Sequence, residues 1–94
     1  MRVRWTGAAR RDLGAMAQYV QENSPQGAKR MIRRIEEAAQ LLSERPHAGK
    51  PGREDGTREL VVTRTPYLLV YELQEYGVEV LRVLHGAQQW PPEQ

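Results

Sequence analysis

Two residues near the end of the sequence are candidates for chemistry. His85 closes an apolar run, and an imidazole with a pKa of about 6.5 can transfer protons at neutral pH. Arg82 is a charge inside the same run, so it needs a carboxylate partner or open water. His85 therefore acts either in catalysis or as a hydrogen-bonding residue at a strand end. Arg82 either contacts a binding partner or pairs with Glu59 or Glu72.

Three more side chains could extend such a site. Arg58 and Arg64 stand at the two ends of one run of residues and could hold a phosphate. Trp90 is either the anchor of a binding surface or a tail residue that packs back onto the fold. The sequence has no cysteine, and its two histidines lie far apart without a carboxylate at ligand spacing. We therefore predict neither a metal site nor a bound cofactor.

Positive charge is concentrated in the first half of the sequence. Lysine and arginine number 14, and aspartate and glutamate 12, which gives a net charge of +2. Residues 1–53 carry a net charge of +6 and residues 54–94 a net charge of −4. Twelve of the 14 basic residues are arginine, which forms flat bidentate contacts to carboxylates and phosphates. The pattern indicates an anionic partner, either a nucleic acid or an acidic protein segment, or else solvated helix faces.

The size and hydropathy of the chain set its class. A sequence of 94 residues predicts a single domain, 1–94. Its apolar stretches are shorter than the roughly 20 residues that a transmembrane helix needs, and the basic N-terminus lacks the apolar run of a signal peptide. We expect a soluble cytoplasmic protein with no membrane partner.

The first half of the sequence predicts a strand followed by a helical hairpin. Alternation over Arg2–Trp5 indicates a short strand, and Thr6 can cap a helix that ends near Glu22–Asn23. Ser24–Pro25 is a second start signal, because serine caps helices and proline fits their first position. This second helix should end at Arg45–Pro46, since a residue before proline avoids helical angles.

The second half predicts a loop and three strands. Residues 46–57 are rich in proline and glycine and lack apolar periodicity. Strands are expected at Arg58–Arg64, Tyr67–Leu73 and Val78–His85, and the nearly apolar middle strand should be covered on both faces. Simple alternation would place Val78, Val80, Arg82 and Leu84 on one face of the last strand. The predicted fold is α+β, in the order β-α-α-β-β-β: a short N-terminal strand and an antiparallel helical hairpin, packed on a small, twisted, mostly antiparallel sheet with one face or edge left available.

Three segments of the sequence resemble a known family. They are the opening W-T-x-x-A-x-x-D-L, the segment from R-E-L-V-V to P-Y-x-L-V-Y, and the closing R-V-L-H-G-x-Q-x-W-P. Together, in this order, they resemble the RelE/ParE superfamily of bacterial toxins. The resemblance implies the toxin of a type II toxin–antitoxin system, held inactive in a hetero-oligomer by a cognate antitoxin. It also implies the fold that the periodicity predicts.

The superfamily contains two mechanisms. RelE-like members are ribosome-dependent endoribonucleases with a basic cluster on the sheet, whereas ParE-like members lack that cluster and poison DNA gyrase. Where ribonuclease members carry an arginine before the Leu-Val-Tyr triplet, this sequence has Leu68, and leucine cannot stabilise a phosphate. The sequence is thus closer to ParE, with gyrase as the expected target and no catalytic residue. In the alternative, mRNA on the ribosome would be cleaved, and the catalytic residues would be Arg82, His85, Arg58 and Arg64.

The resemblance also suggests which residues bind partners. Two arginine pairs on the predicted helices are candidates for binding the antitoxin: Arg10, Arg11, Arg33 and Arg34. Candidates for contact with the target are Arg82, His85 and Trp90.

Overall fold

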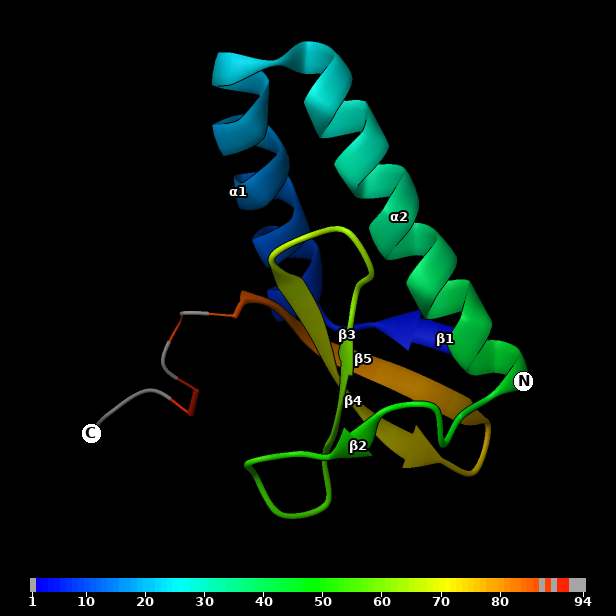
Figure 1. The fold of residues 1–94 in the computed structure, drawn as a ribbon. Coiled ribbons are helices and arrows are strands. Elements are labelled where there is room, and N and C mark those ends of the chain that lie inside the picture. Colours follow the sequence, from blue (N-terminus) through cyan, green and yellow to red (C-terminus); the bar gives the residue numbers. More distant parts are fainter. Residues whose placement is uncertain (1, 87, 89, 92–94) are drawn as a thin grey trace.

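The computed structural model describes residues 2–86, 88, 90 and 91, which form two helices and a five-stranded sheet (Figure 1). The sheet has the strand order β1-β5-β4-β3-β2, with β1 parallel to β5 and the other neighbours antiparallel. The predicted α+β fold is therefore confirmed. The elements are β1 (Arg2–Trp5), α1 (Gly7–Asn23), α2 (Pro25–Glu44), β2 (Lys50–Pro51), β3 (Arg58–Val61), β4 (Tyr67–Gln74) and β5 (Gly77–His85).

The helical hairpin begins and turns at the predicted capping residues. The Thr6 hydroxyl oxygen accepts a hydrogen bond from the amide of Ala9, and the Ser24 hydroxyl oxygen accepts one from the amide of Gly27. These bonds satisfy N–H groups that the first turn of a helix leaves without partners. The two helices run antiparallel on one side of the sheet (Figure 1). Neither has the combination of length and apolar character needed to cross a membrane.

The main core lies between the helical hairpin and the sheet. Ile35 and Leu42 of α2 are fully buried and belong to one hydrophobic cluster with Leu69 and Tyr71 of β4. The Tyr71 hydroxyl donates to the carbonyl oxygen of Pro46 at 2.7 Å and accepts from the amide of Gly49 at 2.9 Å. These two bonds hold the loop after α2 against the sheet. If they broke, the buried hydroxyl would lose its partners, at a cost of about 1–3 kcal/mol.

The predicted loop at 46–57 contains a strand that periodicity did not indicate. Lys50 and Pro51 form β2 and pair with Glu59 and Arg58 of β3. A strand of two residues is too short to show alternation of polar and apolar residues, so the sequence pattern cannot indicate it. β3 also ends at Val61, three residues before the predicted end, because a turn begins there.

Strand β4 is covered on both faces, as its apolar sequence predicted. On the face away from the helices, Leu68 and Val70 form a second cluster with Leu84 of β5. Leu81 and Trp90 pack over this cluster. We expected either the second face or an edge of the sheet to remain available. These residues cover the second face, and the grooves lie at the edges of the sheet.

The prediction that Val80, Arg82 and other alternate residues of β5 share one face was wrong. Val70 pairs with Arg82 and the next residue, Tyr71, pairs with Val80, so Leu81 is an extra residue on β5. Such a β-bulge reverses the alternation of side chains beyond it. Val83 therefore joins the core under the helices, and Leu84 lies on the opposite face.

Candidate functional site

Arg82 forms an ion pair with a carboxylate of the first helix. Its Nε donates to Oδ2 of Asp12 at 2.6 Å and its Nη2 donates to Oδ1 at 3.0 Å. Asp12 Oδ2 also accepts from the backbone amide of Val83 at 3.0 Å. The hydrogen bonds to Asp12 outweigh burial and raise the pKa of Arg82 further above its usual value. The predicted pairing of Arg82 with Glu59 or Glu72 was wrong, because α1 crosses beside β5 and brings Asp12 within reach.

The same helix completes the open edge of β5. β1 pairs with β5 only as far as Val80. Beyond that point the Thr6 hydroxyl donates to the carbonyl oxygen of Leu81 at 2.8 Å, and Asp12 accepts from Val83. Two side chains therefore replace a neighbouring strand along this edge. This arrangement explains why the opening motif of the sequence contains both Thr6 and Asp12.

Trp90 packs on the sheet next to Arg82. The Arg82 guanidinium lies 5.5 Å from the centre of the Trp90 ring, within range of a cation–π interaction. Trp90 also packs on the cluster of Leu68, Val70 and Leu84. Its indole N–H is buried without a hydrogen-bond partner among the described residues. The geometry therefore favours the tail-packing interpretation of Trp90.

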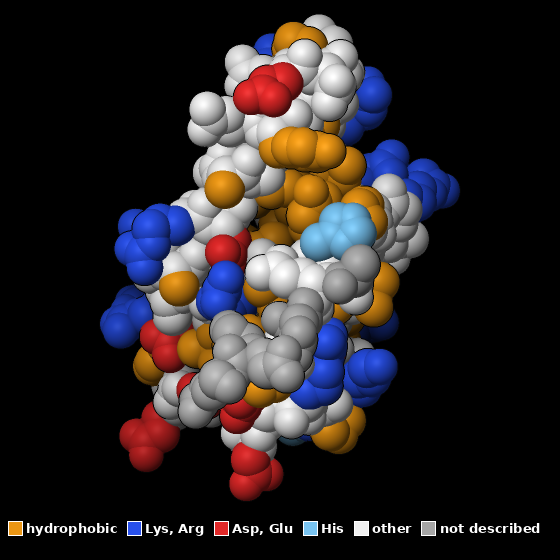
Figure 2. Space-filling model, turned by 90° about the vertical axis from the view of Figure 1, so that its left-hand side faces the viewer, with side chains coloured by type: hydrophobic (Ala, Val, Ile, Leu, Met, Phe, Trp, Pro, Cys, Tyr) orange, Lys and Arg blue, Asp and Glu red, His pale blue; other side chains and the backbone are white. Residues whose placement is uncertain are grey.

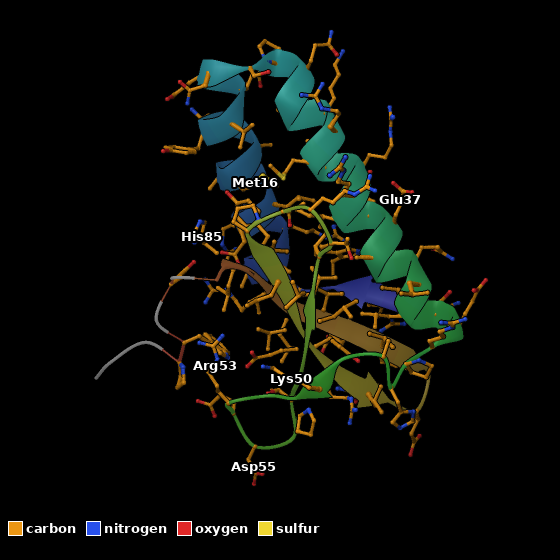
Figure 3. All side chains as sticks on the ribbon, in the orientation of Figure 1. Met16, Glu37, Lys50, Arg53, Asp55 and His85 are labelled. Carbon is orange, nitrogen blue, oxygen red and sulfur yellow. The ribbon has the colours of Figure 1, made fainter. Side chains whose placement is uncertain are left out.

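His85 lies at the exposed end of β5, on the side of α1 (Figure 3). Its ring meets that of Tyr67 edge-to-face, with 5.6 Å between ring centres. Burial and, to a lesser extent, the neighbouring Tyr19 raise the pKa of Tyr67 above its ordinary value of 10.0. Hydrophobic side chains gather on this face below the tip of the helical hairpin (Figure 2). The environment is thus aromatic and apolar.

The four residues of the alternative catalytic set are not brought together. Arg58 donates from Nη2 to the carbonyl oxygen of Gly49 at 2.6 Å and holds the loop near β2. It pairs with Tyr71, whereas His85 pairs with Tyr67, four residues away along β4 or roughly 13 Å at the usual rise of a strand. Arg64 lies exposed in the β3–β4 turn with a φ of 65°. Arg82 is engaged by Asp12.

A second ion pair joins Arg53, in the loop between β2 and β3 (Figure 3), to Glu59 of β3. Glu59 is only 5 % exposed, and its carboxylate accepts from the backbone amide of Arg53 at 2.9 Å and from the Arg53 guanidinium at 3.2 Å. Burial alone would raise the pKa of Glu59, but the hydrogen bonds and charge of Arg53 outweigh it and lower that pKa below its ordinary value of 4.5. Sequence reasoning missed this pair because Arg53 lies in a loop that has no periodic signal, six residues before Glu59 of β3.

We predict that Glu59 makes the protein sensitive to acid. A carboxyl whose pKa is lowered on folding stabilises the fold at pH above its unfolded pKa, and this contribution is lost as the pH falls through the folded value. Replacing Glu59 by Gln should lower the free energy of unfolding at pH 7 by about 1–3 kcal/mol. The same variant should lose less stability between about pH 5 and pH 2. Urea unfolding across this pH range tests it, with the exposed Glu75→Gln as a control that should follow wild type.

The four candidate antitoxin-binding arginines lie on different surfaces. Arg33 and Arg34 line a groove of ≈ 690 Å³ between α2 and β3, here called the α2–β3 groove. Arg10 lines a separate groove between β1 and the two helices, and Arg11 is exposed on α1. Two more arginines line the α2–β3 groove: Arg30, which sequence reasoning did not single out, and Arg64, which it placed in the alternative catalytic set. Its lining residues are Arg30, Arg33, Arg34, Glu37, Ala38, Leu41 and residues 60–64.

Residues able to hold a metal ion do not cluster in the described part of the chain. No three histidine, aspartate or glutamate side chains lie together within residues 2–86, 88, 90 and 91. The acidic residues with the closest contacts, Asp12 and Glu59, are each paired with an arginine. The site is thus built from arginines, aromatic rings and a sheet edge.

Comparison with known proteins assigns this arrangement to a family. Residues 3–90 match the family described as the ParE toxin of the type II toxin–antitoxin system parDE. The chain belongs to the ParE toxin family. It is 42 % identical over 90 residues to Y4kP of Sinorhizobium fredii, which is assigned as a toxin, covering 96 % of this chain and 93 % of that protein. It is 37 % identical over 83 residues to toxin RelE2 of Caulobacter vibrioides, covering 88 % and 92 %.

Two solved structures resemble this toxin closely. One is the chromosomal ParDE toxin–antitoxin system of P. aeruginosa, with a TM-score of 0.80 and 27 % identity over 90 % of this chain and 95 % of the other. The other is the RelBE2 toxin–antitoxin complex of Mycobacterium tuberculosis, with a TM-score of 0.60 and 34 % identity over 88 % and 94 %. The protein is therefore a toxin of the type II toxin–antitoxin class, and its relatives include both ParE-named and RelE-named proteins.

Proposed function

We propose that this toxin is ParE-like: it inhibits DNA gyrase by binding, without cutting RNA, and a cognate antitoxin neutralises it. The observation that carries the proposal is that the arginines on the sheet are already held by other groups of the protein. Arg82 is held by Asp12, and Arg58 is held by loop carbonyl groups. The position that resembles the ribonuclease arginine is Leu68, which is buried in the second cluster. A phosphate would therefore meet few of the donors that RNA cleavage requires.

The surface proposed to meet the target is the end of the sheet where β5 closes. His85 and Tyr67 present a paired aromatic surface there, and Trp90 lies on the opposite face of the sheet with Arg82 across its ring. Aromatic residues and arginine are the types most enriched among residues that dominate binding energy. In this proposal Arg82 positions Trp90, and His85 contacts the target directly. Because gyrase acts on the chromosome, the proposal places the toxin in the cytoplasm.

A RelE-like ribonuclease is the second candidate function. Its support is the similarity to toxin RelE2 and to the RelBE2 complex, together with the exposed position of His85. In that case His85 would move the proton of the 2′-hydroxyl, and Arg64 would contact the phosphate from the same end of the sheet. The two candidates predict different targets, so they can be separated with purified components.

We expect growth to stop when this chain alone is induced and to recover when the small gene beside it is co-expressed. The purified toxin should also inhibit supercoiling of relaxed plasmid by gyrase, in proportion to its concentration. A heat-denatured sample of the same preparation is the control for the supercoiling assay. Unimpaired growth despite confirmed expression of the folded protein would contradict the toxin function, and normal supercoiling at excess toxin would contradict the gyrase proposal.

A further inference from the structure

The α2–β3 groove has the size of a small-molecule site. Its volume of ≈ 690 Å³ lies within the roughly 300–1,000 Å³ that is usual for ligand pockets in proteins. One wall is the side of α2 from Arg30 to Leu41, and the other runs from Leu60 of β3 to Arg64 of the β3–β4 turn. Nη1 of Arg34 donates to the carbonyl oxygen of Arg64 at 3.3 Å. The turn therefore lies beside the N-terminal half of the α2 wall.

That end of the groove carries an excess of positive charge. Its arginines are Arg30, Arg33, Arg34 and Arg64. None of the four forms an ion pair with another residue in the described part of the chain. A guanidinium offers a flat fork of N–H donors, which matches the oxygens of a phosphate group. Four such groups at one end of a groove suit a ligand that carries two or more phosphates.

The rest of the α2 wall changes from polar to apolar in one direction. Glu37 lies about one turn after Arg34, and Ala38 and Leu41 follow it. From Arg34 to Leu41 the helix rises about 10 Å. Leu41 is 38 % exposed although it is a large hydrophobic residue, and Leu60 of β3 adds a second apolar side chain away from the turn. The order along the groove is thus cations, one carboxylate and an apolar slot.

The edge of β3 adds a hydrogen-bond donor and an acceptor to the groove. Val62 donates its amide to Tyr67 on the β4 side, so alternation directs the N–H and C=O of Val61 away from β4. β2 pairs with Arg58 and Glu59, and no strand among the described residues pairs with Val61 on that side. A purine carries an acceptor and a donor side by side on one edge of its ring. The free backbone of Val61 can therefore bind such an edge.

The groove beside β1 lacks this order of groups. Its two charged residues, Arg10 and Glu36, have opposite signs, so the lining carries no net charge. A phosphate there would meet a repelling carboxylate as well as a guanidinium. Arg10 and the exposed Arg11 therefore supply a matched control, because they are arginines of the same helical hairpin that lie on other surfaces.

We propose that the α2–β3 groove binds a purine nucleoside di- or triphosphate. The phosphates lie on the four arginines, the ribose hydroxyls donate to Glu37, and the base lies on Leu41 and Leu60 with one edge at the Val61 backbone. A carboxylate is the group that dinucleotide-binding folds also place on ribose hydroxyls. The separation of charged and apolar ends favours this ligand over one whose charges are spread along its length. The inference goes beyond the proposed function and requires neither gyrase nor an antitoxin.

The first test measures ligand binding to the full chain by isothermal titration calorimetry at low salt. Adenosine diphosphate should bind at least about tenfold more tightly than adenosine, which lacks the phosphates, and than pyrophosphate, which lacks the base. Arg33→Gln with Arg34→Gln should weaken its binding about 10- to 100-fold, and Arg10→Gln with Arg11→Gln less than about threefold. Thermal unfolding checks that both variants are folded. Equal weakening in the two variants, or pyrophosphate binding as tight as that of the nucleotide, would overturn the proposal.

The second test uses Glu37, because two explanations of the groove predict opposite results for it. If the arginines only attract anions, Glu37→Gln removes a repelling charge and should tighten the binding of every phosphate ligand. If Glu37 holds the ribose, the variant should bind adenosine diphosphate about tenfold more weakly and pyrophosphate no more weakly than wild type. The 2′,3′-dideoxy nucleotide, which lacks both hydroxyls, should not be weakened by the change. Unchanged or tighter binding of adenosine diphosphate would contradict the assigned role.

The third test examines the sheet edge and the competing occupant. Val61→Pro removes the outward N–H on an edge where proline is tolerated, so it should weaken adenosine diphosphate about tenfold and leave pyrophosphate unchanged. Val61→Thr keeps the N–H and should bind like wild type. Wild-type binding weaker than about 1 mM, with the Arg33 and Arg34 variant losing only its affinity for the protein of the adjacent small gene, would overturn the inference and leave the groove as a protein-docking surface. Nucleotide binding by a chain that fails to inhibit gyrase would contradict only the proposed function.

Discussion

Messenger RNA on translating ribosomes should remain intact when the purified toxin is added. Removing one charge-stabilising donor typically lowers an enzymatic rate by a factor of about 10²–10³. In this toxin Leu68 replaces one cation, and the loop carbonyls and Asp12 engage Arg58 and Arg82. We therefore expect ribosome-dependent cleavage at least about 10²–10³ times slower than that of a ribonuclease member of the superfamily assayed beside it. Primer extension on a defined message measures both rates.

The same preparation must be shown to be active, because a misfolded toxin would also leave RNA intact. Inhibition of gyrase supercoiling by the same sample supplies that control. The variant His85→Ala separates the mechanisms further. Like the wild type, it should not cleave RNA, and it should bind gyrase more weakly. Robust cleavage that disappears in His85→Ala, with gyrase unaffected, would contradict the ParE-like proposal and favour the ribonuclease.

The elements of the fold could be predicted because their signals are local. Thr6 and Ser24 cap the two helices where their types and positions indicated, since a cap depends on residues only three positions away. The run Tyr67–Leu73 is almost wholly apolar, with Glu72 as its one charged residue, which is typical of a strand covered on both faces. The bulge at Leu81 could not be predicted, because it depends on how β5 meets β4 and not on the residues of β5 alone.

The candidate site could be predicted only in part, for a similar reason. Arg82 needed a carboxylate, but its partner Asp12 lies 70 residues away and is chosen by the path of α1. Arg10 and Arg33 looked alike as exposed basic residues, yet they line different grooves on the two sides of the helical hairpin. Arg64 lies in the α2–β3 groove because the β3–β4 turn brings it there, and the position of that turn relative to α2 depends on the tertiary structure.

Replacing Asp12 by alanine should destabilise the toxin more than any other single change to a charged residue of α1. The change breaks a bidentate pair whose side chains are 18 % and 25 % exposed, and it removes the acceptor of the Val83 amide. Breaking a fully buried pair costs about 3–5 kcal/mol, so this partly exposed pair should cost about 2–3 kcal/mol. For a chain of this length the melting temperature should fall by roughly 10–20 °C.

The loss should also be specific to the contact and not to negative charge on the helix. Glu22→Ala removes an exposed carboxylate of α1 and should change stability by less than about 0.5 kcal/mol. In a double-mutant cycle, Asp12→Ala and Arg82→Ala should show a coupling energy of about 1–3 kcal/mol, because each residue is the partner of the other. Hydrogen exchange at Val83 should accelerate in Asp12→Ala and not in Glu22→Ala. Additive effects with unchanged Val83 exchange would mean that Asp12 does not hold α1 on the edge of β5, and Arg82 would then be available to a phosphate after all.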